Sequence, residues 1–122
     1  IAQRAVITAL DACPSKVDYM IDEFKSRRDL MLKLLSEIKG FKCNKPEGAF
    51  YVFPDVSSFF GKTFKGNKIT NASDLSLFLL KEALVATVTG DAFGNPNCIR
   101  ISYAASKEQI IEAISRIKSV LK

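Results

Sequence analysis

The chain has 122 residues, of which 48% are hydrophobic, and a formal net charge of +5 from 18 Lys and Arg against 13 Asp and Glu. This length and composition suit one soluble domain with a core of its own. The basic residues are scattered rather than gathered in a stripe with aromatic side chains, which argues against nucleic-acid binding. The chain has no histidine, which excludes His-containing zinc sites, histidine bases and Ser-His-Asp triads, and we expect no metal site.

The three cysteines, Cys13, Cys43 and Cys98, are widely spaced and odd in number. This pattern predicts unpaired thiols and a cytoplasmic location. No apolar run reaches the ~18 residues of a membrane span, so we expect no membrane association. The chain begins at Ile1, without a methionine and already in a helical pattern, which we interpret as a piece of a longer protein.

Residues 1–12 have the apolar spacing of a helix that buries one face. Pro14 is tolerated only near a helix start, so a second helix is predicted over residues 14–39, with Gly40 as its stop. Its apolar stripe breaks at Arg27 and Arg28. The residues alone favour a solvated kink there over a helix that passes from one packing environment into another.

Two strands and an irregular segment are predicted next. Residues 41–45 should form a short strand, followed by a turn at residues 46–48. Residues 49–53 form a continuous apolar run, which is typical of a central strand covered on both faces. Residues 56–71 have three phenylalanines without a clear period, and we expect loops or short turns whose aromatic rings pack against the domain.

The second half should supply helices on either side of two more strands. A helix is predicted over residues 71–84, with apolar residues around most of its circumference, then a short strand over residues 85–88. Residues 98–103 alternate as a half-buried strand, with Ile99, Ile101 and Tyr103 on one face. Ser106 and Gln109 form a capping box that begins the last helix. The predicted class is α+β, with a small, mainly antiparallel sheet packed against helices.

Arg100 is the anomaly in the strand over residues 98–103. A guanidinium cannot be deprotonated, so within an apolar strand it needs either open water or a paired anion. Its neighbours on the same face, Cys98 and Ser102, are small and leave room for that anion. The preceding loop, residues 90–97, is rich in turn formers and contains one large aromatic, Phe93, as suits a loop that covers something.

No other residues indicate a chemistry of their own. No glycine-rich nucleotide motif occurs, and Asp18, Asp22 and Glu23 are typical of a solubilising helix surface. No lysine lies in the apolar setting that would depress its pKa for Schiff-base formation. From the residues alone, the chain is a soluble α+β domain with one unusual arginine.

Three stretches resemble class I (fold type I) pyridoxal-phosphate aminotransferases, most of all bacterial-type aspartate aminotransferases. They are Val-Thr-Gly-Asp-Ala-Phe-Gly at residues 88–94 with Ile-Arg-Ile-Ser-Tyr-Ala at residues 99–104, Pro-Glu-Gly-Ala-Phe-Tyr-Val-Phe at residues 46–53, and the opening residues 1–5. The resemblance implies that Arg100 is the substrate-binding residue that holds the substrate α-carboxylate. It also implies that the chain is the C-terminal small domain of such an enzyme.

The resemblance further implies a division of the chain and a function for the parent protein. Residues 1–13 would be a remnant of a large-domain helix, and residues 14–122 the small domain, entered by the long interdomain helix 14–39. The parent, a homodimer, would transfer an amino group between an amino acid and a 2-oxo acid. Its pyridoxal 5'-phosphate would be bound by the missing large domain, so this fragment has no catalytic or cofactor-binding residue and should be inactive alone.

Two alternatives remain open. The parent could be another pyridoxal-phosphate enzyme of the superfamily, such as an aromatic aminotransferase or a carbon–sulfur lyase, which would keep the carboxylate-binding arginine. The chain could also be a non-catalytic α+β interaction module in which Arg100 is a surface ion-pair residue. A cofactor-lysine motif shortly before Ile1 would separate the enzymes from the module.

Overall fold

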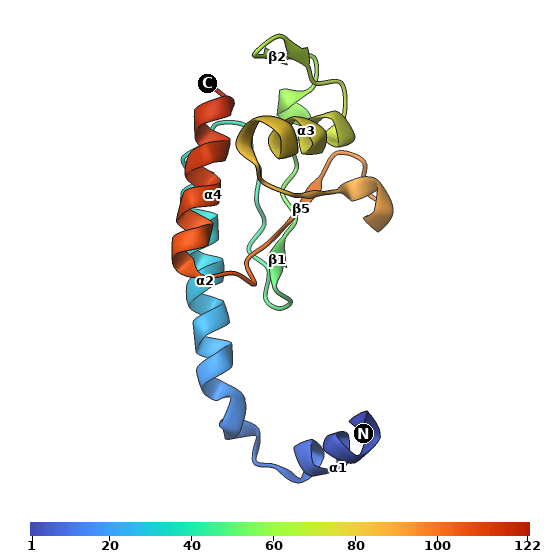
Figure 1. Cartoon of the computed structure of the whole chain (residues 1–122), viewed down its shortest axis with the longest axis vertical. Coiled ribbons are helices and arrows are strands. Elements are labelled where there is room, and N and C mark those ends of the chain that lie inside the picture. Colours follow the sequence, from blue (N-terminus) through green and yellow to red (C-terminus); the bar gives the residue numbers. More distant parts are fainter.

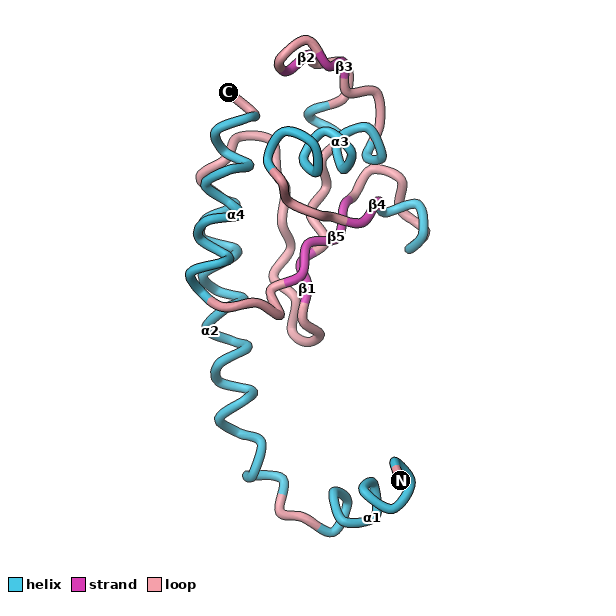
Figure 2. Tube along the Cα trace, viewed as in Figure 1, coloured by secondary structure: helices cyan, strands magenta, loops and turns pink.

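A computed structural model describes residues 1–122, which form four α-helices and five short strands (Figures 1 and 2). Helix α1 (Ala2–Asp11) stands apart at the far end of the long helix α2 (Asp18–Ser36), away from the rest of the chain (Figure 1). A single 3-10 turn, Pro14–Val17, joins them. Proline fits this first turn because its missing N–H would have no helical partner there. The two predicted helices are confirmed, with the second ending three residues early.

Strands β1 (Tyr51–Val52), β5 (Ile99–Ser102) and β4 (Val88–Thr89) form one antiparallel sheet in the order β1-β5-β4. Tyr51 pairs with Ser102, and Val88 pairs with Arg100. The predicted α+β class with a small antiparallel sheet is therefore confirmed. The prediction that residues 49–53 form a central strand covered on both faces is wrong, because β1 lies at the edge and β5 at the centre.

The continuous apolar run at residues 49–53 has another cause. Val52 points into the core, while Tyr51 and Phe53 lie on the outer face and are only partly buried. Tyr51 packs under Arg100, and Phe53 packs edge-on against Phe93, with ring centroids 6.0 Å apart. Apolar side chains on the outer face thus contact an arginine and a loop rather than a second layer of the fold.

Three further predictions need correction. Residues 41–45 make only an isolated bridge, Lys42 to Asp55, and not a strand. The strand expected at residues 85–88 is β4, which begins at Val88. Residues 56–71 contain a hairpin, β2 (Thr63–Phe64) with β3 (Asn67–Lys68), joined through Lys65 and Gly66. Both turn residues have positive φ, 48° and 81°, as a tight hairpin of this kind requires.

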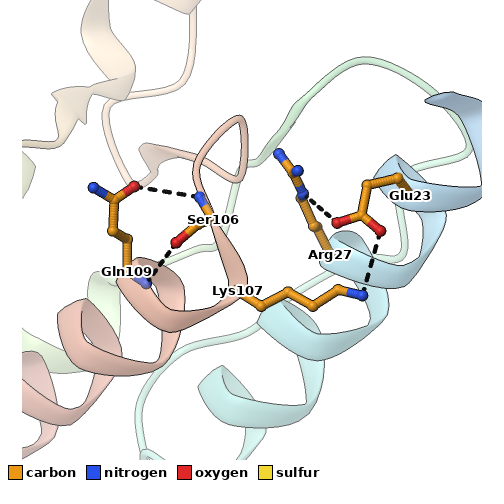
Figure 3. A network of polar contacts seen from close by, with 5 residues as sticks. All are labelled: Glu23, Arg27, Ser106, Lys107 and Gln109. Atoms are coloured by element: carbon orange, nitrogen blue, oxygen red, sulfur yellow. Dashed lines mark hydrogen bonds and ion pairs between the residues drawn. The ribbon is translucent and has the colours of Figure 1, made fainter.

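The core lies between this sheet and helices α2 and α4 (Lys107–Val120), which run side by side (Figure 1). Helix α4 presents one core residue per turn: Ile110, Ile114, Ile117 and Val120. The predicted capping box is confirmed and is drawn in Figure 3. The Ser106 hydroxyl accepts a hydrogen bond from the Gln109 N–H, and the Gln109 side chain accepts one from the Ser106 N–H, each at 3.3 Å.

Helix α3 (Ala72–Phe78) continues into a π-helical turn, Leu79–Ala83, that packs on α4. Asn71 caps α3 by accepting a hydrogen bond from the Asp74 N–H at 2.8 Å. The helix predicted over residues 71–84 was expected to have apolar residues buried around most of its circumference. This prediction is too broad, because Leu77, Leu80 and Leu84 are exposed. The prediction that the phenylalanines of residues 56–71 pack on the domain is confirmed: Phe59 is buried, and Phe60 and Phe64 pack against the core.

All three cysteines are free thiols, as predicted. Cys98 is buried beside β5, and Cys13 is exposed at the junction that follows α1. None of the helices combines the length and the apolar character needed to cross a bilayer.

Candidate functional site

Arg100 lies on the central strand β5, with its side chain on the outer face of the sheet. Its neighbours Ile99 and Ile101 are 0% and 5% exposed, because they point into the core. Successive side chains of a strand alternate between faces, so burial of these two isoleucines directs Arg100 outwards. The strand is anchored by the core on one side and presents a half-buried arginine on the other.

Two aromatic rings lie against the Arg100 guanidinium. Its Cζ atom is 5.4 Å from the centroid of the Tyr51 ring and 4.7 Å from that of Phe93. Tyr51 reaches it from β1, where its partner Ser102 lies two residues beyond Arg100 and therefore on the same face. Phe93 reaches it from the loop between β4 and β5. Arginine stacks favourably on aromatic faces, and such contacts leave its N–H edges free.

No carboxylate of the chain pairs with Arg100. Arg27, Arg28 and Arg116 each contact an acidic side chain within 2.9 Å, whereas Arg100 takes part in none of the ion pairs of the chain. A guanidinium fork with free N–H groups matches the two oxygens of a carboxylate or phosphate. The arrangement can therefore bind an anion that comes from outside these 122 residues.

The loop that supplies Phe93 is closed by backbone hydrogen bonds. The Gly90 N–H donates to the Cys98 carbonyl at 2.8 Å, and the Asn95 N–H donates to the Gly90 carbonyl at 3.1 Å. A Cβ atom at Gly90 would collide with the carbonyl oxygens of Asn95 and Cys98, so the close approach requires glycine. Thr89 adds a hydrogen bond from its hydroxyl to the Asp91 carboxylate at 2.8 Å.

A separate groove lies elsewhere on the chain. This groove of about 390 Å³ runs between the first half of α2 and the turn at residues 47–49, and it does not include Arg100. Tyr103 lines it and donates a hydrogen bond from its hydroxyl to the Ala49 carbonyl at 3.1 Å. Burial raises the pKa of the Tyr103 phenol, so this hydroxyl remains a hydrogen-bond donor. The groove has an apolar lining: Val17, Met20, Ile21, Phe24, Ala49 and Tyr103.

The lysines of the chain do not fit the task of holding an aldehyde cofactor. All of them are exposed except Lys107, which is half-buried and forms an ion pair with Glu23 at 3.3 Å. A Schiff-base lysine needs desolvation or another cation nearby, and no charged group of this chain is buried. The structure also has no group of three residues that could ligate a metal ion.

The cysteines do not form a reactive site either. Burial raises the pKa of the Cys98 thiol, which keeps it protonated. The exposed Cys13 thiol contacts the Ser15 hydroxyl at 3.0 Å, and this hydrogen bond lowers its pKa. Cys13 lies beside neither Arg100 nor another titratable partner, so the outer face around Arg100 is the best-formed site of the chain.

Arg100 stands out from the sequence alone, but its contact with the Tyr51 ring does not. The sequence held no local signal for this contact, because Tyr51 and Arg100 share a face only when Tyr51 pairs with Ser102, and that register is a property of the folded sheet. Phe93 was expected to belong to a covering loop, and its ring does lie on the outer face of the sheet beside Arg100.

Comparison with known proteins shows the family to which the chain belongs. A family model described as aminotransferase class I and II matches residues 1–117. The chain belongs to this aminotransferase family. A curated relative from Petunia hybrida, a bifunctional aspartate aminotransferase and glutamate/aspartate-prephenate aminotransferase, is 45% identical over 99% of the chain.

Solved aminotransferases share the fold. The aspartate aminotransferase from Rhizobium meliloti superimposes with a TM-score of 0.92 at 38% identity over 98% of this chain, which is 30% of that protein. An aromatic aminotransferase from Pyrococcus horikoshii gives a TM-score of 0.74 at 38% identity over 88% of this chain and 26% of its own. The chain spans only about a quarter of the Petunia relative, 26% of its length.

Proposed function

We propose that this chain is the C-terminal small domain of a pyridoxal-phosphate-dependent aminotransferase that transfers an amino group between an amino acid and a 2-oxo acid. Arg100 is its substrate-binding residue and holds the substrate α-carboxylate. The observation that carries this assignment is the half-buried guanidinium of Arg100, stacked on Tyr51 and Phe93 without a carboxylate of its own chain. Family membership supports the same role.

In this role the α-carboxylate accepts two parallel hydrogen bonds from the guanidinium fork. Two bonds fix the orientation of the carboxylate and hence of the Cα that bears the amino group. The rings of Tyr51 and Phe93 shield the ion pair from water, which strengthens the interaction. Pyridoxal phosphate supplies the electron-accepting chemistry in such enzymes and would be held by residues outside this chain.

The division at residues 13 and 14 is part of the proposal. Every residue of α1 is exposed, including the apolar Val6, Ile7 and Leu10. Helix α2 changes character along its length: Met20 and Ile21 are 44% and 46% exposed, whereas Met31 and Leu35 are buried. Such surfaces are expected where residues 1–13 belong to a large domain and α2 runs from it into the small domain.

The wider assignments follow from the family rather than from the site. We infer amino-acid and 2-oxo-acid substrates, a homodimeric parent and a cytoplasmic location. The matched proteins include aspartate, prephenate and aromatic aminotransferases, and the amino donor of this parent is not assigned. An α-carboxylate is common to all such substrates, so the proposed role of Arg100 holds for each of them.

The test is kinetic and uses the complete parent enzyme loaded with its cofactor. We expect Arg100→Lys to lower kcat/KM by roughly 30- to 1000-fold, because lysine offers a point charge in place of a two-pronged donor, and Arg100→Ala to lower it further. The value of kcat/KM should fall by the same factor for two chemically different amino donors. Arg116→Lys is the matched control, since Arg116 pairs with Glu112 on the exposed face of α4.

Normal kinetics in a folded Arg100→Lys enzyme would refute the assignment. A loss confined to one donor would place Arg100 in side-chain recognition instead. If Arg100 were an ordinary surface ion-pair residue, its replacement would lower the free energy of unfolding by at most about 1 kcal/mol and would leave catalysis intact.

A further inference from the structure

The contacts of Phe93 go beyond covering the outer face of the sheet. Its ring centroid is 4.7 Å from the Arg100 Cζ atom, closer than the 5.4 Å of Tyr51. Phe93 is nevertheless 46% exposed, so burial of its own surface does not account for its position. An aromatic ring at this distance attracts the guanidinium and so favours one position of it.

The Phe93 ring is itself held from two sides. Phe53 packs edge-on against it, with an interplanar angle of 78°. The 3-10 turn Gly90–Phe93 ends at Gly94, which adopts φ of +79° and donates its N–H to the Asp91 carbonyl. Since Gly90 can approach Cys98 only without a Cβ atom, the turn is fixed to the start of β5, two residues before Arg100.

Arg100 forms no ion pair within the chain, and the rings of Tyr51 and Phe93 lie against its guanidinium. A long arginine side chain loses rotamer freedom when it binds a ligand, and that loss lowers affinity unless the side chain is already ordered. Rings against the guanidinium order it while leaving its N–H edges free for a carboxylate.

We propose that Phe93 is a positioning residue that orders the Arg100 guanidinium before the substrate carboxylate arrives. This inference rests on the proposed role of Arg100. Phe93 acts on the carboxylate through Arg100 and therefore affects every carboxylate ligand alike. A ligand without a carboxylate does not depend on it.

The experiment uses the full-length parent enzyme with its cofactor and the variant Phe93→Leu. Dissociation constants are measured by calorimetry for succinate and 3-phenylpropionate, two carboxylates that differ in the rest of the molecule. We expect both to bind roughly 3- to 30-fold more weakly, the range of one partly desolvated cation–ring contact. Phe93→Tyr, which keeps the ring, should restore binding. Phe64→Leu is the matched control, because Phe64 contacts the rings of Phe59 and Phe78 but no cation.

Two further measurements separate positioning from a merely structural role. Single-turnover reaction should slow for an amino acid but not for the matching amine that lacks the α-carboxylate. In an Arg100→Ala background, Phe93→Leu should have no additional effect on carboxylate binding, because nothing remains to be positioned.

The outcomes distinguish this inference from the proposed function. Equal losses for amino acid and amine, or additive effects with Arg100→Ala, would overturn the positioning role of Phe93. So would unchanged carboxylate binding in Phe93→Leu when Arg100→Ala weakens it. Unchanged binding in Arg100→Ala itself would instead refute the proposed function.

Discussion

The hydroxyl of Tyr103 donates a hydrogen bond to the carbonyl oxygen of Ala49 at 3.1 Å and ties the end of β5 to the turn before β1. Ala49 has a φ of +64°, a conformation that is unfavourable for a residue with a Cβ atom. The Tyr103 N–H also donates to the Phe50 carbonyl at 2.8 Å. The buried tyrosine thus holds a strained turn in place at the edge of the sheet.

Tyr103→Phe should lower the free energy of unfolding by about 0.5–1.5 kcal/mol, the contribution of one intramolecular hydrogen bond. Urea unfolding of the 122-residue chain measures this loss. Tyr19→Phe, at an exposed tyrosine of α2, should leave the midpoint unchanged. Equal stability of Tyr103→Phe and the original chain would show that the hydroxyl does not hold the turn.

Ser106→Ala removes the N-cap of α4 and should cost about 1 kcal/mol of stability. The lost hydroxyl leaves the Gln109 N–H without its acceptor at the start of a helix that carries much of the core. Thermal unfolding checks the effect. Ser119→Ala, near the exposed end of the same helix, serves as the control and should change stability by less than about 0.5 kcal/mol.

Gly90→Ala should destabilise the chain by about 1–3 kcal/mol, because the new methyl group meets two carbonyl oxygens and must displace the loop over residues 90–97. Gly48→Ala is the paired control, since a Cβ atom at Gly48 has no neighbour within 4 Å. Chemical unfolding of both variants tests the difference. Equal midpoints would mean that the loop adapts to a side chain at Gly90.

Acid should weaken the contact between α2 and α4. Hydrogen bonds from Arg27 and Lys107 hold the pKa of the Glu23 carboxyl below its usual value (Figure 3). A lowered carboxyl pKa contributes stability above the unfolded-state value of about 4.3, and this stability is lost as pH falls through the folded-state pKa.

The variant Glu23→Gln isolates this contribution. The free energy of unfolding of the original chain should therefore fall more steeply than that of Glu23→Gln as the pH is lowered from about 5 to 3. Urea titrations across this range measure both curves. The difference in slope between the two curves should shrink at about 1 M salt, because exposed charges are screened. Parallel curves would show that Glu23 makes no net contribution.

The chain alone should be catalytically silent. Its lysines are exposed or ion-paired, so pyridoxal phosphate should give no stoichiometric change in cofactor absorbance and no amino transfer above that of the free cofactor. Titration with the cofactor followed by borohydride reduction and peptide mapping checks this. Specific labelling of one lysine would contradict it.

Local patterns were sufficient for the helices and for the half-buried strand. The capping box at Ser106, the Asn71 cap and the alternation through Ile99 and Ile101 are each specified within a few residues of the chain. Hydrogen bonds of a cap and the alternation of a strand connect near neighbours, and the local order of residues therefore predicts them. The unusual character of Arg100 was evident for the same reason, since it is a charged side chain between two isoleucines of a strand whose other side chains on the face of Arg100, Cys98 and Ser102, are small.

Strand order and the surroundings of Arg100 depended on contacts between distant residues. A continuous apolar run cannot reveal whether it lies at the centre of a sheet or at its edge, and the run at residues 49–53 lies at the edge because β5 pairs on both sides. Tyr51 and Phe93 meet at Arg100 only through the register of β1 on β5 and the closure of the loop after β4. Register is set by pairing and packing across the whole domain, and only the tertiary structure could therefore place two rings on one guanidinium.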